Sequence, residues 1–284
     1  MTSRNLFKNE PVKIVDGLQY YSQPDTDYNK NYEKISADHL AASASDDSNP
    51  WISEEQWSQM ESSTLALVKK YVIGGEKDTC SILDVGVGIG RLLSLVRSEL
   101  PGTALETYGM DISESYLRKC IGKGLTVVYS RIEDMPFSDG AFDIVICTDV
   151  LEHVLDLNFC VKKLLDVVRP GGYLIIRVPN REDLAPYLST EYPYGYAHLR
   201  SFEENSLRLL FTKIFGAEVR EVVPGLIWQS SSLLKYRIPI RGYERVLGLI
   251  LKAIKSISPP SYRNLVAMAY YPLEINIVVQ KPAV

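Results

Sequence analysis

The chain has 284 residues, 46% of them hydrophobic, which is enough for a sizeable core. Its formal net charge of -4 argues against broad nucleic-acid binding through phosphate neutralisation, although a local basic patch is compatible with it. Four cysteines lie in apolar stretches without a Cys-x-x-Cys pair, and we interpret them as reduced core thiols. The first residues lack the apolar segment of a signal peptide and no uncharged run could span a bilayer, so we expect a cytoplasmic protein.

Residues 1–50 are polar, rich in tyrosine and end in a linker-like run of Ser, Asp, Asn and Pro. We interpret them as an N-terminal extension, in which residues 20–39 are expected to form a lid. A helix is predicted to begin at Ser53, because Gln56 follows it at the spacing of a capping box.

Segments that favour strands then alternate with segments that favour helices. This alternation is typical of an α/β protein with a parallel sheet covered by helices on both faces. The expected strands are residues 81–85, 105–110, 126–129, 142–147 and 173–178, and the expected helices are residues 91–99, 113–121 and 157–168.

A glycine-rich turn follows the first expected strand. Gly86, Gly88 and Gly90 alternate with other residues just before a helix, an arrangement that presents backbone N–H groups to a ligand. Asp111 ends the second expected strand, where a carboxylate can accept hydrogen bonds from the ribose hydroxyls of a nucleotide ligand. An alternative role for Asp111 is to cap the helix that follows it.

Two features favour a cationic ligand over a dinucleotide. Asp84 precedes the turn and would repel phosphate but attract an ammonium or sulfonium group. The G-x-G-x-G spacing also differs from the G-x-G-x-x-G of nicotinamide and flavin sites. After the third expected strand, Glu133 and Asp134 beside Met135 are suited to an adenine amino group; alternatively, they form a solvated turn before Pro136.

Taken in order, these motifs resemble the class I S-adenosylmethionine-dependent methyltransferases, in particular the group with small-molecule, lipid-quinone and sugar substrates. The segments F-D-I-V-I-C-T-D-V-L-E-H-V from Phe142 and R-P-G-G-Y-L-I-I-R-V-P from Arg169 extend the resemblance, which covers residues 53–223 and 273–280. It implies a Rossmann-like, seven-stranded, mostly parallel sheet with helices on both faces and an antiparallel last strand. The methyltransferase domain would comprise residues 51–223 and 273–284.

The resemblance also implies a site for S-adenosylmethionine, with S-adenosylhomocysteine as product. The glycine turn would line the methionine moiety, Asp84 would support its ammonium group, and Asp111 would bind the ribose. Residues 133–135 would cradle the adenine, and residues 148–150 would close the pocket under the sulfonium. The cofactor-binding residues implied are Asp84, Gly86, Gly88, Gly90, Arg91, Asp111, Ile112, Glu133, Asp134, Met135, Thr148, Asp149 and Val150.

Methyl transfer to a hydroxyl group needs a base or a metal to remove the proton of the acceptor. His153 and His198, after the fourth and fifth expected strands, are the candidate catalytic residues. With Asp149 and Glu152 they resemble the metal site of plant-type small-RNA 2′-O-methyltransferases and, less completely, ubiquinone-pathway O-methyltransferases. Asp149 replaces a glutamate there and shortens the reach, so a divalent metal is not expected. Alternatively, Glu152 and His153 only pack near the cofactor.

The expected acceptor is a small molecule or glycan precursor that is methylated on an oxygen or a nitrogen, and we favour the oxygen. Its walls would be the lid and the aromatic loop 191–202, in which Tyr194 could stack and Arg200 could bind an anion; both segments could instead be surface packing. A nicotinamide oxidoreductase is disfavoured by Asp84 and by the glycine spacing. A binding protein that keeps the cofactor fold is the non-enzymatic alternative.

Residues 224–272 are a long insertion before the last strand, far longer than a hairpin loop. Within residues 231–263 there are seven basic residues and one acidic residue. The insertion could lie on a membrane, form a substrate cap or homodimer contact, bind a phosphorylated substrate, or pack on its own domain. We favour the cap or dimer. The expected helix places Arg241, Arg245, Lys252 and Lys255 on one stripe and Val246, Leu247, Ile250 and Ile254 opposite it.

Overall fold

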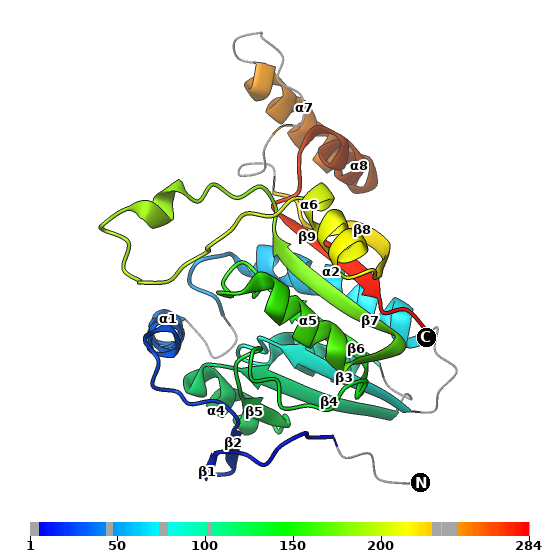
Figure 1. The fold of residues 1–284 in the computed structure, drawn as a ribbon. Helices are drawn as coiled ribbons and strands as arrows, with labels where there is room; N and C mark the ends of the chain where they lie inside the picture. Colours follow the sequence, from blue (N-terminus) through cyan, green and yellow to red (C-terminus); the bar gives the residue numbers. More distant parts are fainter. Residues whose placement is uncertain are drawn as a thin grey trace.

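The computed structural model describes residues 6–43, 48–73, 79–100, 104–228, 234 and 243–283. Its centre is a nine-stranded sheet in the order β1-β2-β5-β4-β3-β6-β7-β9-β8 (Figure 1). The strands are β1 (Lys13–Val15), β2 (Leu18–Tyr20), β3 (Thr79–Val85), β4 (Ala104–Asp111), β5 (Val127–Tyr129), β6 (Phe142–Thr148), β7 (Val168–Pro179), β8 (Glu218–Leu226) and β9 (Glu274–Gln280).

Eight α-helices accompany the sheet in the described residues, with a short 3₁₀ turn at Ala185–Leu188 and a π turn at Leu210–Ile214. The helices are α1 (Asp27–Ala42), α2 (Glu54–Ile73), α3 (Arg91–Glu99), α4 (Glu114–Gly122), α5 (Leu157–Val167), α6 (Glu204–Leu209), α7 (Tyr243–Ile257) and α8 (Pro259–Ala269).

The sheet confirms the predicted α/β class. Strands β2, β5, β4, β3, β6 and β7 run parallel, and β9 lies antiparallel between β7 and β8. The expected number of seven strands was wrong, because the N-terminal extension adds the hairpin β1–β2 beside β5. Strand β2 has only three residues, and its partner β5 lies far along the sequence, so no local pattern revealed the pairing.

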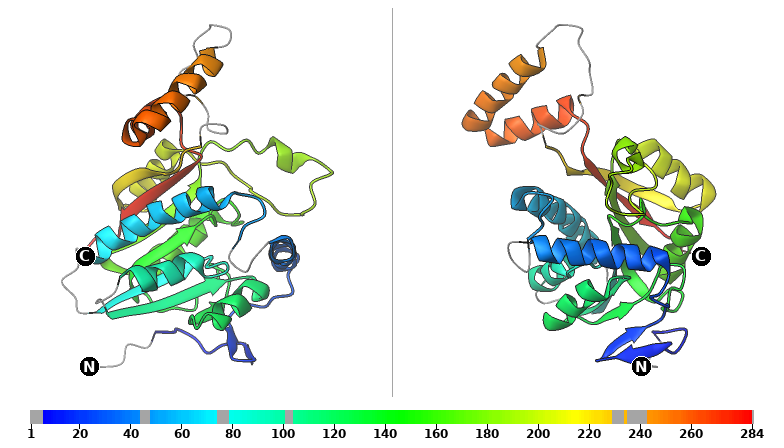
Figure 2. Two further views of the ribbon diagram at one scale, coloured as in Figure 1. Left: turned by 180° about the vertical axis from the view of Figure 1, so that it is seen from behind. Right: turned by 90° about the vertical axis from the view of Figure 1, so that its left-hand side faces the viewer.

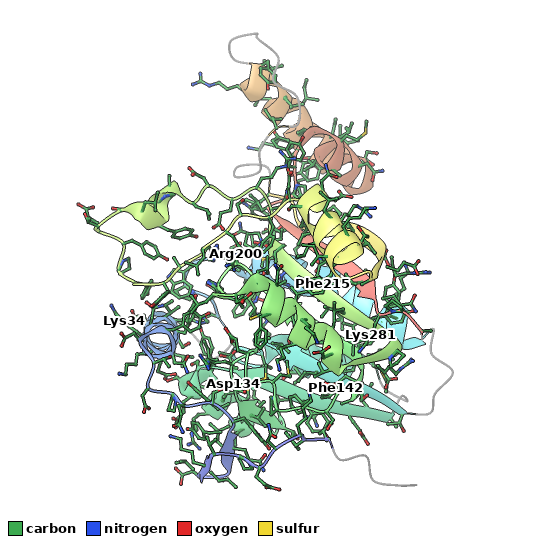
Figure 3. The ribbon with its side chains drawn as sticks, in the orientation of Figure 1. Lys34, Asp134, Phe142, Arg200, Phe215 and Lys281 are labelled. Carbon is green, nitrogen blue, oxygen red and sulfur yellow. The ribbon has the colours of Figure 1, made fainter. Side chains whose placement is uncertain are left out.

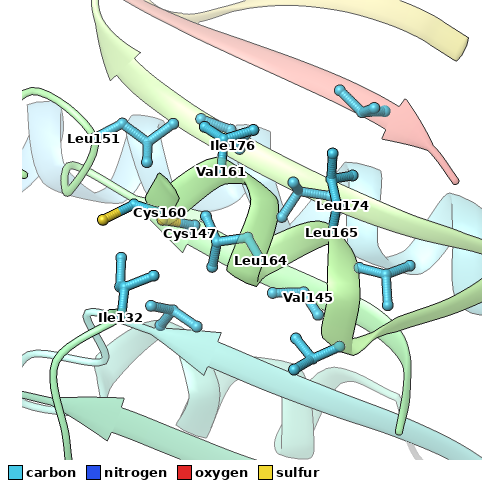
Figure 4. Packing of buried hydrophobic residues seen from close by; sticks show 14 of the residues in the cluster. Ile132, Val145, Cys147, Leu151, Cys160, Val161, Leu164, Leu165, Leu174 and Ile176 are labelled. Carbon is cyan, nitrogen blue, oxygen red and sulfur yellow. The ribbon is translucent and has the colours of Figure 1, made fainter. Parts of the chain in front are cut away.

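Alternate side chains of the central strands point to opposite faces of the sheet. Cys147 of β6 and Ile176 of β7 pack against Val161 of α5 on one face (Figure 4). Ile146 and Ile175, the residues next to them along the same strands, pack against α2 and α3 on the other face. This burial on both faces explains the nearly continuous apolar runs of β6 and β7. All four cysteines are buried free thiols, as predicted.

Two helix starts follow the expected capping chemistry. The backbone N–H of Gln56 donates to Ser53 Oγ at 3.3 Å, and the Ser53 N–H donates to Gln56 Oε1 at 3.0 Å, which confirms the capping box of α2. Ser113 caps α4 by accepting the N–H of Tyr116. Ser113 therefore fills the capping role that was the alternative for Asp111.

The insertion folds into α7 and α8, which project from one end of the molecule, far from the hairpin β1–β2 (Figure 2). A small cluster of Leu251, Val266 and Tyr270 joins them. Of the predicted basic stripe, Arg241 lies outside the described residues. Across the described part of the chain, every helix is too short or too polar to cross a membrane.

Helix α6 offers a matched test of the core. Leu207 is 0% exposed and Leu209 is 57% exposed on the same helix. We expect Leu207→Ala to lower the free energy of unfolding by about 2–5 kcal/mol, because it leaves a cavity. Leu209→Ala should change it by less than about 0.5 kcal/mol. Urea denaturation of both variants measures the difference, and equal losses would contradict this packing.

Candidate functional site

A cavity of about 360 Å³ lies where the turns after β3, β4, β5 and β6 meet. This carboxyl edge of a parallel sheet is where ligands bind in open α/β folds, and the volume suits a small ligand. Most of the predicted residues come together there. Those that line the cavity are Asp84, Gly86, Gly88, Arg91, Asp111, Ile112, Glu133, Thr148, Asp149, Val150 and His153.

The glycines of the turn have different tasks. Gly86 and Gly88 line the cavity with φ of +77° and +53°, and a Cβ added to Gly86 would lie 2.2 Å from Val150 Cγ2. A Cβ on Gly88 would meet no atom within 4 Å, so the backbone there borders open space. Gly90 does not line the cavity. A Cβ at Gly90 would lie 2.4 Å from Leu125 Cδ1, so its task is close packing.

One end of the cavity is strongly acidic. Burial raises the pKa of Asp84 to about 7, although the nearby Arg177 opposes this rise. Burial likewise raises the pKa of Glu61 to about 7, although Glu61 pairs with Arg91 at 2.8 Å. Asp84 Oδ1 lies buried without a hydrogen-bond partner in the described chain. A ligand cation would satisfy this oxygen.

Arg177 is buried in β7 and engages Asp149 at the cavity floor. Its Nε donates to Asp149 Oδ1 at 3.1 Å, its Nη2 lies 2.5 Å from Oδ2, and its Nη1 donates to Thr64 Oγ1 at 3.2 Å. Asp149 itself has a φ of +57°. Since this carboxylate is already engaged in an ion pair, Asp149 contributes to the shape of the cavity floor.

The carboxylate of Asp111 is fixed by the backbone around it. It accepts N–H groups from Gly88 at 2.9 Å, Ile112 at 2.7 Å and Ser113 at 2.9 Å. Burial raises the pKa of Asp111, and these three hydrogen bonds oppose the rise. Asp111 thus links the glycine turn to the end of β4.

The three residues expected around adenine point in different directions. Glu133 lines the cavity. Asp134 instead accepts from Arg131 Nε at 3.0 Å and from Ser22 Oγ at 2.8 Å, and Met135 is buried in the core. The chain turns at this point, so successive side chains diverge, and only Glu133 of the three lies at the cavity.

Glu152, His153 and His198 form a compact group, of which only His153 lines the cavity. Nδ1 of His153 lies 3.3 Å from the carbonyl of Ala197, and burial lowers the pKa of His153 to about 4. Its ring meets that of His198 edge-on, with centroids 4.6 Å apart, and His198 Nδ1 pairs with Glu182. Glu152, His153 and His198 each offer a ligand atom within 4.8 Å of the others. This trio could act on protons or hold a metal ion.

Helix α1 contributes Tyr28, Tyr32 and His39 to the lining of the cavity. The aromatic loop contacts the outer side of α1, where Gly195 donates its N–H to Asn31 Oδ1 at 2.8 Å. The two segments expected to be separate substrate walls are therefore joined to each other.

Tyr194 and Arg200, the two residues expected to bind the substrate, do not line the cavity. Tyr194 donates its hydroxyl to Asp38 of α1 at 3.2 Å. Arg200 donates to the carbonyls of Leu151 at 2.9 Å and Leu155 at 3.3 Å, near the start of α5 (Figure 3). The guanidinium of Arg200 thus supports the turn after β6, and the structure gives it no position for binding a substrate anion.

Several residues that line the cavity were not predicted from the sequence. Glu61 interrupts the apolar face of α2, and Arg177 interrupts an apolar strand. A charged or polar residue inside an apolar pattern signals a buried partner, and that signal could have identified them. Trp57, which stacks under the Arg91 guanidinium at 4.6 Å, carried no such signal.

Comparison with known proteins connects this geometry to a family. Residues 83–176 match a family described as a methyltransferase domain. A ubiquinone biosynthesis O-methyltransferase of Pseudomonas entomophila is 29% identical over 160 residues, which are 50% of this chain and 66% of that protein. An uncharacterized protein of Methanocaldococcus jannaschii is 30% identical over 179 residues, 61% of this chain and 74% of that protein.

The fold has close counterparts among solved structures. A methyltransferase of Thermotoga maritima, described as a possible histamine N-methyltransferase, superposes with a TM-score of 0.54 at 19% identity, covering 89% of this chain and 99% of that one. At this identity the likeness concerns the fold alone. The chain spans 46% to 66% of the length of the ubiquinone-pathway relatives it matches.

The two raised carboxyl pKa values predict how stability depends on pH. Asp84 and Glu61, with pKa values of about 7, hold protons in the folded state that the unfolded chain releases at about pH 4. Their contribution to the free energy of unfolding therefore falls as pH rises from about 4 to 7. We expect Asp84→Asn to flatten this fall, measured by urea denaturation across that range. The exposed Asp25→Asn should leave the profile unchanged, and parallel profiles for Asp84→Asn and the parent protein would refute the assignment.

Proposed function

The chain belongs to the class I S-adenosylmethionine-dependent methyltransferases, and on that premise we propose that it methylates an oxygen of a small-molecule or glycan-precursor acceptor. The observation that carries the proposal is the unpartnered Asp84 Oδ1, buried in the cavity beside the glycine turn. An acidic end of this kind disfavours a phosphate and favours a cationic ligand. We assign residues 51–223 and 273–284 to the catalytic domain.

The residues present suit S-adenosylmethionine, which would supply a methyl group on a positively charged sulfur. We assign Asp84 and Glu61 to its ammonium group and Asp111 to its ribose. Glu133 is assigned to the adenine amino group, because among the three residues expected there it is the one at the cavity. The backbone of Gly88 borders open space and can approach a ligand closely.

We favour an oxygen acceptor because of the histidine pair and the names of the ubiquinone-pathway relatives. A carbonyl can only accept, so Nδ1 of His153 carries a proton towards Ala197 and Nε2 remains an acceptor. His153 lines the cavity and is the candidate to take the hydroxyl proton. His198, whose Nδ1 pairs with Glu182, would hold the ring of His153 in place through their edge-on contact.

A metal-assisted reaction is the second candidate, and the grouping of Glu152, His153 and His198 favours it. A divalent ion held there would lower the pKa of an acceptor hydroxyl. Asp149 would not be a ligand in this arrangement, since it pairs with Arg177.

A glycine comparison tests the cofactor site. Gly88 and Gly124 both have positive φ and open space around an added Cβ, but of the two only Gly88 lines the cavity. We expect Gly88→Ala to weaken S-adenosylhomocysteine binding at least tenfold, measured by calorimetry, because the methyl group occupies ligand space. Gly124→Ala carries the same backbone strain and should bind as the parent does. Equal affinities in the two variants would remove the glycine turn from the site.

The base is tested with an acceptor found by screening hydroxyl compounds with methyl-labelled donor. We expect His153→Ala to lower kcat by about two to four orders of magnitude and His198→Ala to lower it less, with S-adenosylhomocysteine affinity unchanged. Glu182→Gln should lower kcat less than His153→Ala does, because Glu182 pairs with His198 and does not itself line the cavity.

Chelation distinguishes the two candidate mechanisms. Turnover that persists in EDTA supports the histidine base. Turnover that stops in EDTA and returns with Mg²⁺ or Mn²⁺ would replace the base with the metal, and full turnover in both histidine variants would exclude both.

A further inference from the structure

Helix α7 has one wide apolar face, and the other helix of the insertion covers part of it. Leu247 and Leu251 face the cluster that α7 shares with Val266 and Tyr270 at that helix. The remaining part of the apolar face needs cover as well.

The adjoining part of this apolar face is exposed. Leu249 is 69% and Ile257 is 83% exposed, and Val246 and Ile250 are also exposed. Their spacing of three, four and seven residues places them on one continuous strip of the helix. Met268 of α8 adds a further exposed apolar side chain. We call the strip Val246, Leu249, Ile250 and Ile257 the α7 strip.

Cations border the α7 strip along one edge. Arg245 and Lys252 are exposed on α7, four residues before and three residues after Leu249. Lys255 is exposed as well but lies away from this edge, 5.5 Å from the centre of the Tyr262 ring. In sequence, residues 231–263 carry seven basic residues and one acidic residue, so the insertion is basic in a chain whose net charge is -4.

This distribution of charge selects among partners for the strip. In a symmetric dimer built on α7, the same surface of two copies would meet, and the cations of both would be brought together. An anionic surface would instead be attracted here and repelled by the remaining chain. Exposed apolar residues bordered by lysine and arginine are the arrangement by which helices lie in a lipid interface.

We propose that α7 docks on the surface of an anionic phospholipid bilayer. The α7 strip enters the boundary between headgroups and acyl chains, and Arg245 and Lys252 lie at the level of the lipid phosphates. This inference concerns a surface separate from the cavity and does not depend on the proposed methyl transfer.

The topology places this surface on the edge of the sheet that holds the cavity. The insertion leaves the sheet at Leu226 of β8 and returns at Glu274 of β9, which pair with each other. Glu274 also pairs with Pro179, at the carboxyl end of β7. The projecting helices in Figure 2 thus start from the carboxyl edge, so docking would bring the cavity edge near the lipid.

The test is flotation of the full chain with phospholipid vesicles. We expect binding to vesicles with 30% phosphatidylserine in 50 mM salt, weak binding to pure phosphatidylcholine, and release in 500 mM salt, because salt screens the attraction. Arg245→Gln with Lys252→Gln should lower the partition coefficient about 30-fold, since each cation near an anionic surface contributes a factor of about five. Leu249→Glu with Ile257→Glu should lower it further, by removing the inserted side chains.

Matched controls keep the result specific. Lys30→Gln with Lys213→Gln removes two exposed cations elsewhere, and Leu188→Glu changes an apolar side chain that is also highly exposed. Both should bind vesicles as the parent does, and all variants should keep the parent's melting temperature and S-adenosylhomocysteine affinity. The proposal is overturned if the parent protein does not float with anionic vesicles, or if the controls lose binding equally. A dimer in sedimentation equilibrium that Leu249→Glu dissociates, without vesicle binding, would assign the strip to a second copy.

Discussion

The buried guanidinium of Arg177 holds together the floor of the cavity. It pairs with Asp149 and donates to Thr64, and it opposes the rise in the pKa of the buried carboxyl groups of Asp84 and Glu61. Carboxyl groups so close together would repel one another without a central cation. The acidic cavity, and with it a site for a cationic ligand, depends on this one side chain of β7. Replacing a buried charge of this kind leaves its partners uncompensated.

The repeating strand–helix core could be predicted because its signals are local. Apolar runs, glycines at the turn and capping residues such as Ser53 and Ser113 act within a few positions of one another. The hairpin β1–β2 could not be predicted, since it depends on pairing with β5, far along the chain. The same distinction between local and non-local signals applies to the side chains of the cavity. Residues on the ends of strands were found, while the direction of Asp134 and Met135 depended on the path of one turn.

Helix α1 and the aromatic loop 191–202 are bonded to each other and do not form two separate substrate walls. Asn31 of α1 binds the backbone at Gly195, and Tyr194 binds Asp38 of the same helix. These hydrogen bonds hold the two segments together. If the proposed methyl transfer holds, the acceptor would meet the side chains that do line the cavity, among them Tyr28, Tyr32 and His153.

The two outer strands of the sheet limit strand pairing between copies of the protein. Strand β1 has only three residues and carries Lys13, and it pairs with β2 on its inner side. At the other margin, β8 carries charged Glu218 and Arg220, and its register shifts twice along β9. Short, charged and irregular margins oppose the addition of a strand from another chain. The sheet is thus protected against fibrous growth at both ends, and self-association by strand pairing is discouraged even at high concentration.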